Sequence, residues 1–365
     1  MAPQAIRKPP FVNHLLNWFK RDEPSTDNHL FRLHHQYTTF IIMFGFLFIF
    51  IENYLDGRAI TCQGGDQYTK AYCWIHGSSY VGKHLQGEIT GCFVHPDIVE
   101  SANNEPVTSY YLWLPLLLTF CFLFAKIPRN IWRSGLEGGK IKNILQDNKN
   151  LNIKAIHSNF QDERSFFFMY QIKFMICEIL NLVMIGFSIW TTHILLRSKF
   201  RGYGPAVLKY LFFDATSSKE PVHNPMCEVF PTEVGCRIRV GSPAGGIEEH
   251  NYLCILSNNL FNQKYFLFLW VWWICLAILS FLGLIYRCAR IAIPDFSRYV
   301  LSLSVKSVKL ENLKLSSGDC FVLDRLNKNM IPRQMNLLLE EIRTRQIKQE
   351  NEENTDISVL LDKLG

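Results

Sequence analysis

Apolar residues in this chain gather in four long runs, and charged residues fill most of the remaining sequence. The runs cover residues 37–55, 110–127, 166–196 and 265–286. A helix needs about 20 mostly apolar residues to cross a bilayer, so each run is long enough to be a membrane span. The third run contains Lys173 and Glu178, and a buried core helix therefore stays an alternative for that run.

Polar and helix-breaking residues inside the runs raise the question of a pore. Pro115 lacks the backbone donor of a helix interior, but neighbouring helices in a membrane bundle can satisfy the carbonyl that it frees. Two interpretations stay open for Pro115: a passive kink, or a hinge that couples one helix end to a pore. Lys173 and Glu178 likewise predict either an interhelical polar contact or the lining of a pore.

Charge predicts how the chain crosses the membrane. The formal net charge is +6, and basic residues crowd segment 128–165 and follow the fourth run, whereas segment 56–109 carries more acidic residues. Positive residues mark the cytoplasmic side, so both termini and the middle loop are predicted to be cytoplasmic. His34 and His35 are interpreted as interfacial polar residues, with a sensor of cytoplasmic acid as the alternative.

The spans and charges together predict the organisation of the chain. The segments are a cytoplasmic N-terminal arm (1–36), TM1 (37–55), extracellular loop 1 (56–109), TM2 (110–127), a cytoplasmic loop (128–165), TM3 (166–196), extracellular loop 2 (197–264), TM4 (265–286) and a cytoplasmic C-terminal region (287–365). In the last region, Met335, Leu338, Leu339 and Ile342 follow helical spacing after Pro332. The charged stretch 350–356 is predicted to be flexible.

Cysteines provide independent support for two outer loops. Of the 11 cysteines, Cys62, Cys73 and Cys92 lie in the first predicted outer loop, and Cys227, Cys236 and Cys254 lie in the second. Oxidising surroundings favour a disulfide set, but six cysteines permit many connectivities and the sequence does not choose among them. The spacing fits no common zinc pattern and no catalytic motif stands out, so no metal, cofactor or enzyme activity is predicted.

The segment YYLWLP contains Tyr110, Tyr111, Trp113 and Pro115 at the start of the second run. It resembles YYQWV, a signature of innexins, the invertebrate gap-junction proteins. Segments 27–39, 72–80, 136–139 and 252–273 resemble further family segments in the family's order. The chain departs from the family at Leu112, where the signature has Gln, at Ser257, where Pro is usual, and at Gln263, where Glu is usual.

The resemblance implies a fold and a function. The fold is an all-α membrane protein, a four-transmembrane-helix bundle with disulfide-linked extracellular loops and a helical cytoplasmic domain. The function is that of a gap-junction channel subunit in the plasma membrane. Its octameric rings, made of this chain with or without other innexins, dock with rings on an adjacent cell and pass ions and small metabolites. Membrane lipid is a further partner, and nucleic acid is not. Two alternatives stay open: an undocked, pannexin-like hemichannel and a non-conducting adhesion protein.

The resemblance also implies roles for individual residues. Loop cysteines of the family pair between the loops, first with last, which gives Cys62–Cys254 and Cys73–Cys236. We add the prediction that the two remaining cysteines, Cys92 and Cys227, pair with each other inside this nested arrangement. The N-terminal arm of the family folds into the cytoplasmic pore mouth. Candidate pore-lining residues are therefore Phe11, Leu15 and Trp18, with Glu52 at the end of the first span.

Overall fold

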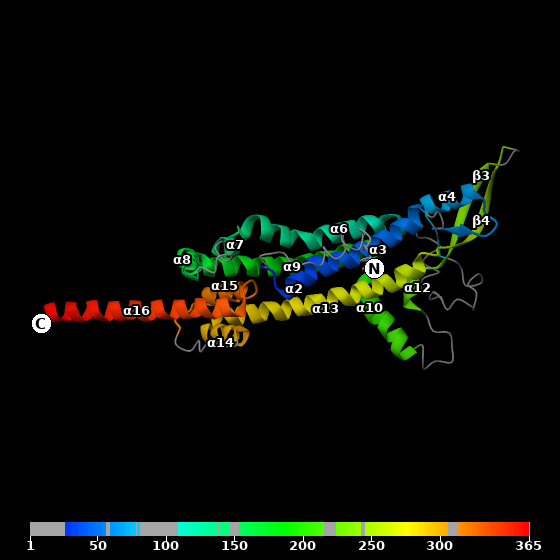
Figure 1. Cartoon of the computed structure of the whole chain (residues 1–365). Coiled ribbons are helices and arrows are strands. Elements are labelled where there is room, and N and C mark those ends of the chain that lie inside the picture. Colours follow the sequence, from blue (N-terminus) through cyan, green and yellow to red (C-terminus); the bar gives the residue numbers. More distant parts are fainter. Residues whose placement is uncertain are drawn as a thin grey trace, which may run out of the picture. The chain divides into compact units, whose positions relative to one another are not determined.

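The computed structural model is predominantly helical (Figure 1). It describes residues 26–55, 59–77, 79–80, 109–137, 139–145, 153–214, 224–241, 245–305 and 313–364. Four helices in this part of the chain are long and apolar enough to cross a membrane: His29–Tyr54, Tyr110–Leu136, Ile153–Leu195 and Asn259–Ala292. One predicted apolar run lies in each of them, apart from a residue at the ends of two runs, which confirms the predicted fold class.

The helices extend beyond the apolar runs because polar segments continue or cap them. Asn28 caps the first helix, since its Oδ1 accepts a hydrogen bond of 2.7 Å from the backbone N–H of Phe31. The helices of the first half are α2 (His29–Arg32), η1 (Leu33–Tyr37), α3 (Thr38–Phe50), η2 (Ile51–Leu55), α4 (Gln67–His76), α6 (Tyr110–Ile131), η4 (Trp132–Leu136), α7 (Lys140–Ile144) and α8 (Ile153–Glu163). Those of the second half are η6 (Arg164–Phe166), α9 (Phe167–Leu195), α10 (Phe200–Lys209), η7 (Tyr210–Asp214), α12 (Pro225–Val229), α13 (Asn259–Ala292), α14 (Pro294–Val305), α15 (Ser317–Asn327) and α16 (Pro332–Leu364).

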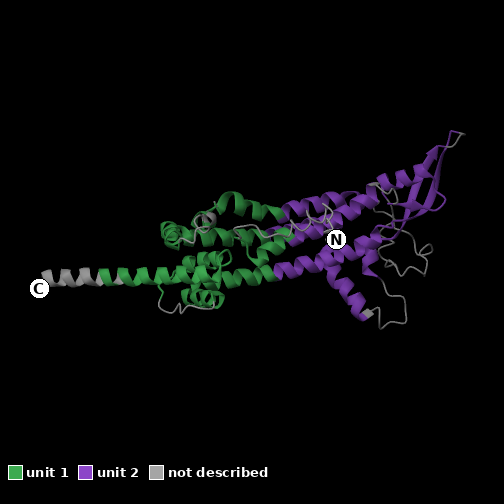
Figure 2. Cartoon of the chain, in the orientation of Figure 1, with its two compact units in different colours: residues 1–36, 126–182, 279–365 green, residues 37–125, 183–278 purple. Residues whose placement is uncertain are grey.

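The chain forms two compact units (Figure 2). Unit 1 comprises residues 1–36, 126–182 and 279–365, and unit 2 comprises residues 37–125 and 183–278. The core of unit 1 contains the buried side chains of Trp132, Phe160 and Phe321, together with one face of α16. That face is formed by Met335, Leu338, Leu339 and Ile342, which are all at most 1% exposed, as their helical spacing predicts.

The charged stretch 350–356 is helical, so the predicted flexible segment is wrong. It belongs to α16, which continues without a break to Leu364. Charge pairs one turn apart support the middle of this helix: Arg345 Nε lies 2.8 Å from Glu341 Oε1, and Lys348 Nζ lies 3.8 Å from Glu352 Oε1. Such pairs each stabilise a helix slightly, and the alternation of acidic and basic residues therefore favours a solvated helix here.

Polar residues in or beside the apolar runs form contacts within unit 1. The Glu178 carboxylate accepts from Arg287, with Oε1 2.8 Å from Nη2 and Oε2 3.0 Å from Nε. This geometry matches the interhelical ion pair, one of the two interpretations of the third run. His34 and His35 are buried within unit 1: His34 Nε2 lies 2.6 Å from Ser280 Oγ, and His35 Nε2 lies 2.8 Å from Asp27 Oδ2.

Gly318 lies where α15 approaches the backbone at the start of α9. A Cβ at this position would lie 2.6 Å from the backbone N of Phe168 and 2.8 Å from the carbonyl carbon of Phe167. Alanine improves helix propensity by about 1 kcal/mol, but forcing a methyl group against backbone costs about 1–3 kcal/mol. The clash dominates, because a backbone cannot rotate away as a side chain can.

We therefore expect Gly318→Ala to lower the thermal midpoint of the purified protein in detergent by several degrees, on the order of a 2 kcal/mol loss. The matched control is Gly202→Ala in α10, where a Cβ would meet no atom within 4 Å. A Gly318→Ala midpoint equal to that of Gly202→Ala would contradict the close packing of α15 on α9.

Candidate functional site

Both predicted outer loops contribute strands to one antiparallel sheet in unit 2. The strands are β1 (Thr61–Cys62), β2 (Ser79–Tyr80), β3 (Glu233–Gly241) and β4 (Ile247–Ile255), and their order in the sheet is β1-β4-β3-β2. The β3–β4 hairpin from the second loop is therefore flanked on both sides by a short strand from the first. One face of β3 is buried through Val234, Cys236 and Ile238, in the period-two pattern of a half-buried strand.

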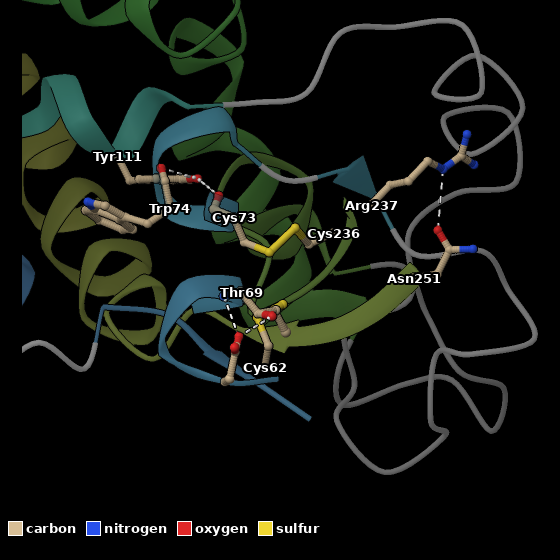
Figure 3. The surroundings of a disulfide bond; sticks show 10 residues. Cys62, Thr69, Cys73, Trp74, Tyr111, Cys236, Arg237 and Asn251 are labelled. Atoms are coloured by element: carbon tan, nitrogen blue, oxygen red, sulfur yellow. Dashed lines mark hydrogen bonds between the residues drawn. A yellow bond between two sulfur atoms is a disulfide. The ribbon is translucent and has the colours of Figure 1, made fainter. Parts of the chain in front are cut away.

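Two disulfides join the loops inside this sheet. Cys62 is bonded to Cys254, its direct cross-strand neighbour, over 192 residues of chain. Cys73 of α4 is bonded to Cys236 of β3 over 163 residues (Figure 3). These are the two pairs that the family resemblance implies. All four cysteines are at most 4% exposed, so both bonds lie in the core of the loop domain, which comprises strands β1 to β4 together with α4.

The structure describes only one of the two other cysteines of the predicted outer loops. Cys227, in α12, is also disulfide-bonded. Cys92, its predicted partner, lies outside the described residues, so their pairing stays a prediction. The sulfurs of Cys62, Cys73 and Cys254 come within 4.8 Å of one another, as ligands of a metal would. Their disulfides account for this proximity, because a bonded sulfur is not the thiolate that binds zinc.

Asp66 fixes the start of α4, the helix that carries Cys73. Its Oδ1 accepts from the backbone N–H of Thr69 at 2.8 Å and from the Thr69 hydroxyl at 2.7 Å. These two hydrogen bonds, the side-chain one first, hold the pKa of the Asp66 carboxyl below its usual value. The cap therefore keeps its charge at neutral pH and weakens only as the pH falls through that lowered pKa.

Tyr111 of the signature connects α4 to the start of α6. Its hydroxyl lies 3.3 Å from the carbonyl oxygens of both Cys73 and Trp74, and can donate to either (Figure 3). Its ring stacks on the Trp74 indole, with 4.4 Å between centroids. Tyr111 is 3% exposed, so the contact is a buried joint between the loop domain and a membrane helix.

Removing the Tyr111 hydroxyl should weaken the contact between α4 and α6 without creating a cavity. We expect Tyr111→Phe to destabilise the protein by about 1–2 kcal/mol, since the stacking remains but one buried hydrogen bond is lost. Thermal unfolding of the detergent-solubilised protein measures the effect. Trp113→Phe is the matched control, because Trp113 is 55% exposed. Equal midpoints for the two variants would show that the hydroxyl does not stabilise the joint.

Pro115 lies inside α6, and a side chain of the neighbouring helix η2 donates a hydrogen bond to the carbonyl that the proline leaves without a helical donor. Without an N–H at Pro115, the carbonyl of Tyr111 has no helical partner four residues on, and Asn53 Nδ2 approaches it at 3.5 Å. The Tyr54 hydroxyl donates to the adjacent carbonyl of Leu112 at 3.2 Å. Asn53 is in turn the acceptor for the Asn258 side chain. The hydrogen bonds beside Pro115 therefore connect α6, η2 and Asn258, which lies just before α13.

The remaining predicted site residues lie in different surroundings. Tyr110 packs edge-on against Phe230, with 5.7 Å between centroids. Glu52 lies in η2, is partly exposed and forms no ion pair with another described residue. Phe11, Leu15 and Trp18 lie outside the described residues.

Sequence reasoning missed the polar residues whose hydrogen bonds fix the start of α13. Gln263, singled out only as a departure from the family, donates from Nε2 to the carbonyl of Phe230 at 2.9 Å. The Tyr203 hydroxyl donates to the carbonyl of Gln263 at 2.8 Å. Asn259 donates to the carbonyl of Pro231. The only signal was a polar cluster directly before an apolar run, which does not identify partners 28–60 residues away.

Comparisons with known proteins agree with this architecture. A family model described as Innexin matches residues 27–346. Innexin inx2 of Drosophila melanogaster is 29% identical over 336 residues, which cover 86% of this chain and 89% of that protein. Innexin inx2 of Schistocerca americana is also 29% identical over 336 residues, covering 86% and 91%. Innexin inx3 of Drosophila melanogaster is 26% identical over 345 residues, covering 88% and 85%. Because the family model spans most of the chain, this protein belongs to the innexin family of gap-junction channel proteins.

Proposed function

We propose that this chain assembles into octameric rings that dock with rings on an adjacent cell to form one continuous pore for ions and small metabolites. The observation that carries the docking step is the loop domain, in which strands of both loops share one sheet and two disulfides. A preformed surface loses little conformational entropy on contact, whereas mobile loops would lose much. Closed rings follow because one four-helix subunit encloses no wide channel.

The orientation proposed for the chain places the loop domain outside the cell. Basic residues in 128–165 and after the fourth helix favour the cytoplasm for those segments and for both termini. Disulfides also persist on the oxidising side, which agrees with extracellular loops at 56–109 and 197–264. The spans proposed are 37–55, 110–127, 166–196 and 265–286, which the longer helices contain apart from the last residue of the first and of the third span.

The pore is proposed to be lined by Phe11, Leu15 and Trp18 of the N-terminal arm and by Glu52. Partial exposure of Glu52 within one subunit supports its part of this proposal. As a member of the innexin family the chain is a channel protein, and we propose no enzyme activity for it. Rings of this chain alone are proposed as the basic assembly, and other innexins as additional partners within or between rings.

Single-particle imaging of the purified protein in lipid nanodiscs tests ring formation and docking together. We expect eightfold rings, with a fraction stacked in pairs through the disulfide-linked domains. Epitopes placed after residue 365 should be labelled only in permeabilised cells. Monomers, rings of another order, or pairs joined through the other face would each contradict the corresponding part of the proposal.

A further inference from the structure

Glu178 is the meeting point of three segments of unit 1. Its carboxylate accepts two hydrogen bonds from Arg287 of α13, and its Oε1 also accepts from Asn28 Nδ2 at 2.7 Å. Asn28 is the residue that caps α2, so this acceptor holds the very start of the first helix. The Glu178 and Arg287 side chains are 7% and 4% exposed, and their contact is therefore largely shielded from water.

A second arginine lies beside this ion pair and forms no ion pair itself with another described residue. Arg325 of α15 is 2% exposed, and neither its Nε nor its Nη1 has a hydrogen-bond partner among the described residues. Its guanidinium lies over the rings of Phe174 and Phe321, 4.8 Å from each centroid. The Arg287 guanidinium lies over the same two rings, at 5.2 and 5.0 Å.

These contacts leave two buried guanidinium groups around one carboxylate. An unpaired buried charge is costly, and its cost falls if it gains a carboxylate. Burial, and then the neighbouring Arg287, lower the pKa of Arg325, whereas the carboxylates of Asp324 and Glu178 act in the opposite direction. The Glu178 carboxylate thus attracts the Arg325 guanidinium as well as that of Arg287, with which it is paired in this structure.

Packing connects the same site to the start of the first helix. Phe174 lies one helical turn before Glu178 on α9, and its ring lies 5.4 Å from Phe31 of α2 and 5.5 Å from Phe321 of α15. One face of α9 therefore contacts both the first helix and the C-terminal region, although Asn28 and Arg325 share no hydrogen bond or ion pair among the described contacts. A displacement of α15 therefore changes the packing of the α9 face that α2 also contacts.

We propose that Glu178 is a shared acceptor for which Arg287 and Arg325 compete, so that the position of α15 sets how firmly the first helix is held and thereby regulates the channel. When Arg287 holds Glu178, Oε1 is placed to accept from Asn28. When α15 brings Arg325 to Glu178, Asn28 loses that acceptor. Two discrete packings of this kind are the usual basis of a conformational switch. The regulatory step rests on the proposed channel function, whereas the competition itself does not.

Hydrogen exchange of the purified full-length protein in nanodiscs tests the competition directly. Arg325→Met keeps the apolar stem and removes the competing charge. We expect exchange of backbone amides in residues 28–37 to slow by about threefold or more, the size expected for coupled sites. The matched control is Arg343→Met on α16, whose side chain is exposed, and it should leave these amides unchanged.

Two results would overturn the proposal. In the first, Arg325→Met alters exchange within α15 but not in residues 28–37, which would make Arg325 a purely structural residue of its own helix. In the second, Arg325→Met fails to accumulate or melts earlier than wild type, which would show that its charge is compensated in the fold. Arg325→Lys, which keeps a cation there, should leave residues 28–37 close to wild type.

Transjunctional current adds a functional readout through a double-mutant cycle of Asn28→Ala and Arg325→Met. Non-additive shifts of the half-inactivation voltage are expected, whereas additive shifts would argue against coupling through Glu178. If wild-type pairs carry no current, the proposed channel function fails and the exchange result still decides the competition.

Discussion

Replacing both Cys62 and Cys254 by serine is expected to remove the protein from the cell surface and abolish coupling. This bond joins the loops across 192 residues, and losing a native disulfide typically costs about 2–5 kcal/mol. A typical domain is stable by only about 5–15 kcal/mol, so this loss removes a large share of the stability of the loop sheet. Surface biotinylation followed by dual-cell recording measures both consequences.

Cys275→Ser provides the control, because Cys275 is a free, exposed cysteine. It should reach the surface and conduct like wild type. If the double serine variant did the same, the disulfide would not be needed to form the loop domain, and its proposed role in docking would fail.

Glu178→Leu is expected to have the second largest effect. The substitution leaves Arg287 buried without its carboxylate and takes an acceptor from Asn28. Breaking one side of a buried ion pair costs about 3–5 kcal/mol, so we expect severe loss of thermal stability and of surface delivery. Fluorescence-detected size-exclusion chromatography after heating provides the measurement.

A second substitution sharpens the interpretation. Glu178→Leu combined with Arg287→Met should recover most of the loss, because apolar residues of similar size often replace a buried pair without penalty. Lys173→Met in the same helix is the control, since Lys173 forms no ion pair with another described residue and its loss should be mild. Equal stability of Glu178→Leu and Lys173→Met would contradict the importance of the pair.

Sequence periodicity was sufficient for the features that depend on local pattern. Runs of apolar residues predicted four membrane helices, and the spacing of Met335, Leu338, Leu339 and Ile342 predicted the buried face of α16. The segment 350–356 was predicted wrongly because composition alone favoured disorder. Charge pairs of neighbouring turns, such as Lys348 with Glu352, favour a helix in the same sequence.

Contacts between distant residues were beyond sequence reasoning. A carboxylate in an apolar run implies a partner, but nothing in one sequence identifies Arg287, 109 residues away, or Asn28, 150 residues away. Arg325 gave no signal at all, because an arginine in a polar helix is ordinarily solvated. Likewise Pro115 implied a donor for a freed carbonyl, whereas its identity as Asn53 depends on how α6 meets η2.

The transjunctional current between two abutting cells that lack other junction proteins tests the central claim most directly. Under dual voltage clamp, we expect current between paired cells that express this chain and none through the membrane of isolated cells. That result would show that the rings conduct when they are docked. Current in isolated cells only would contradict docking, and no current in either case, with the protein at the surface, would contradict a channel formed by this chain alone.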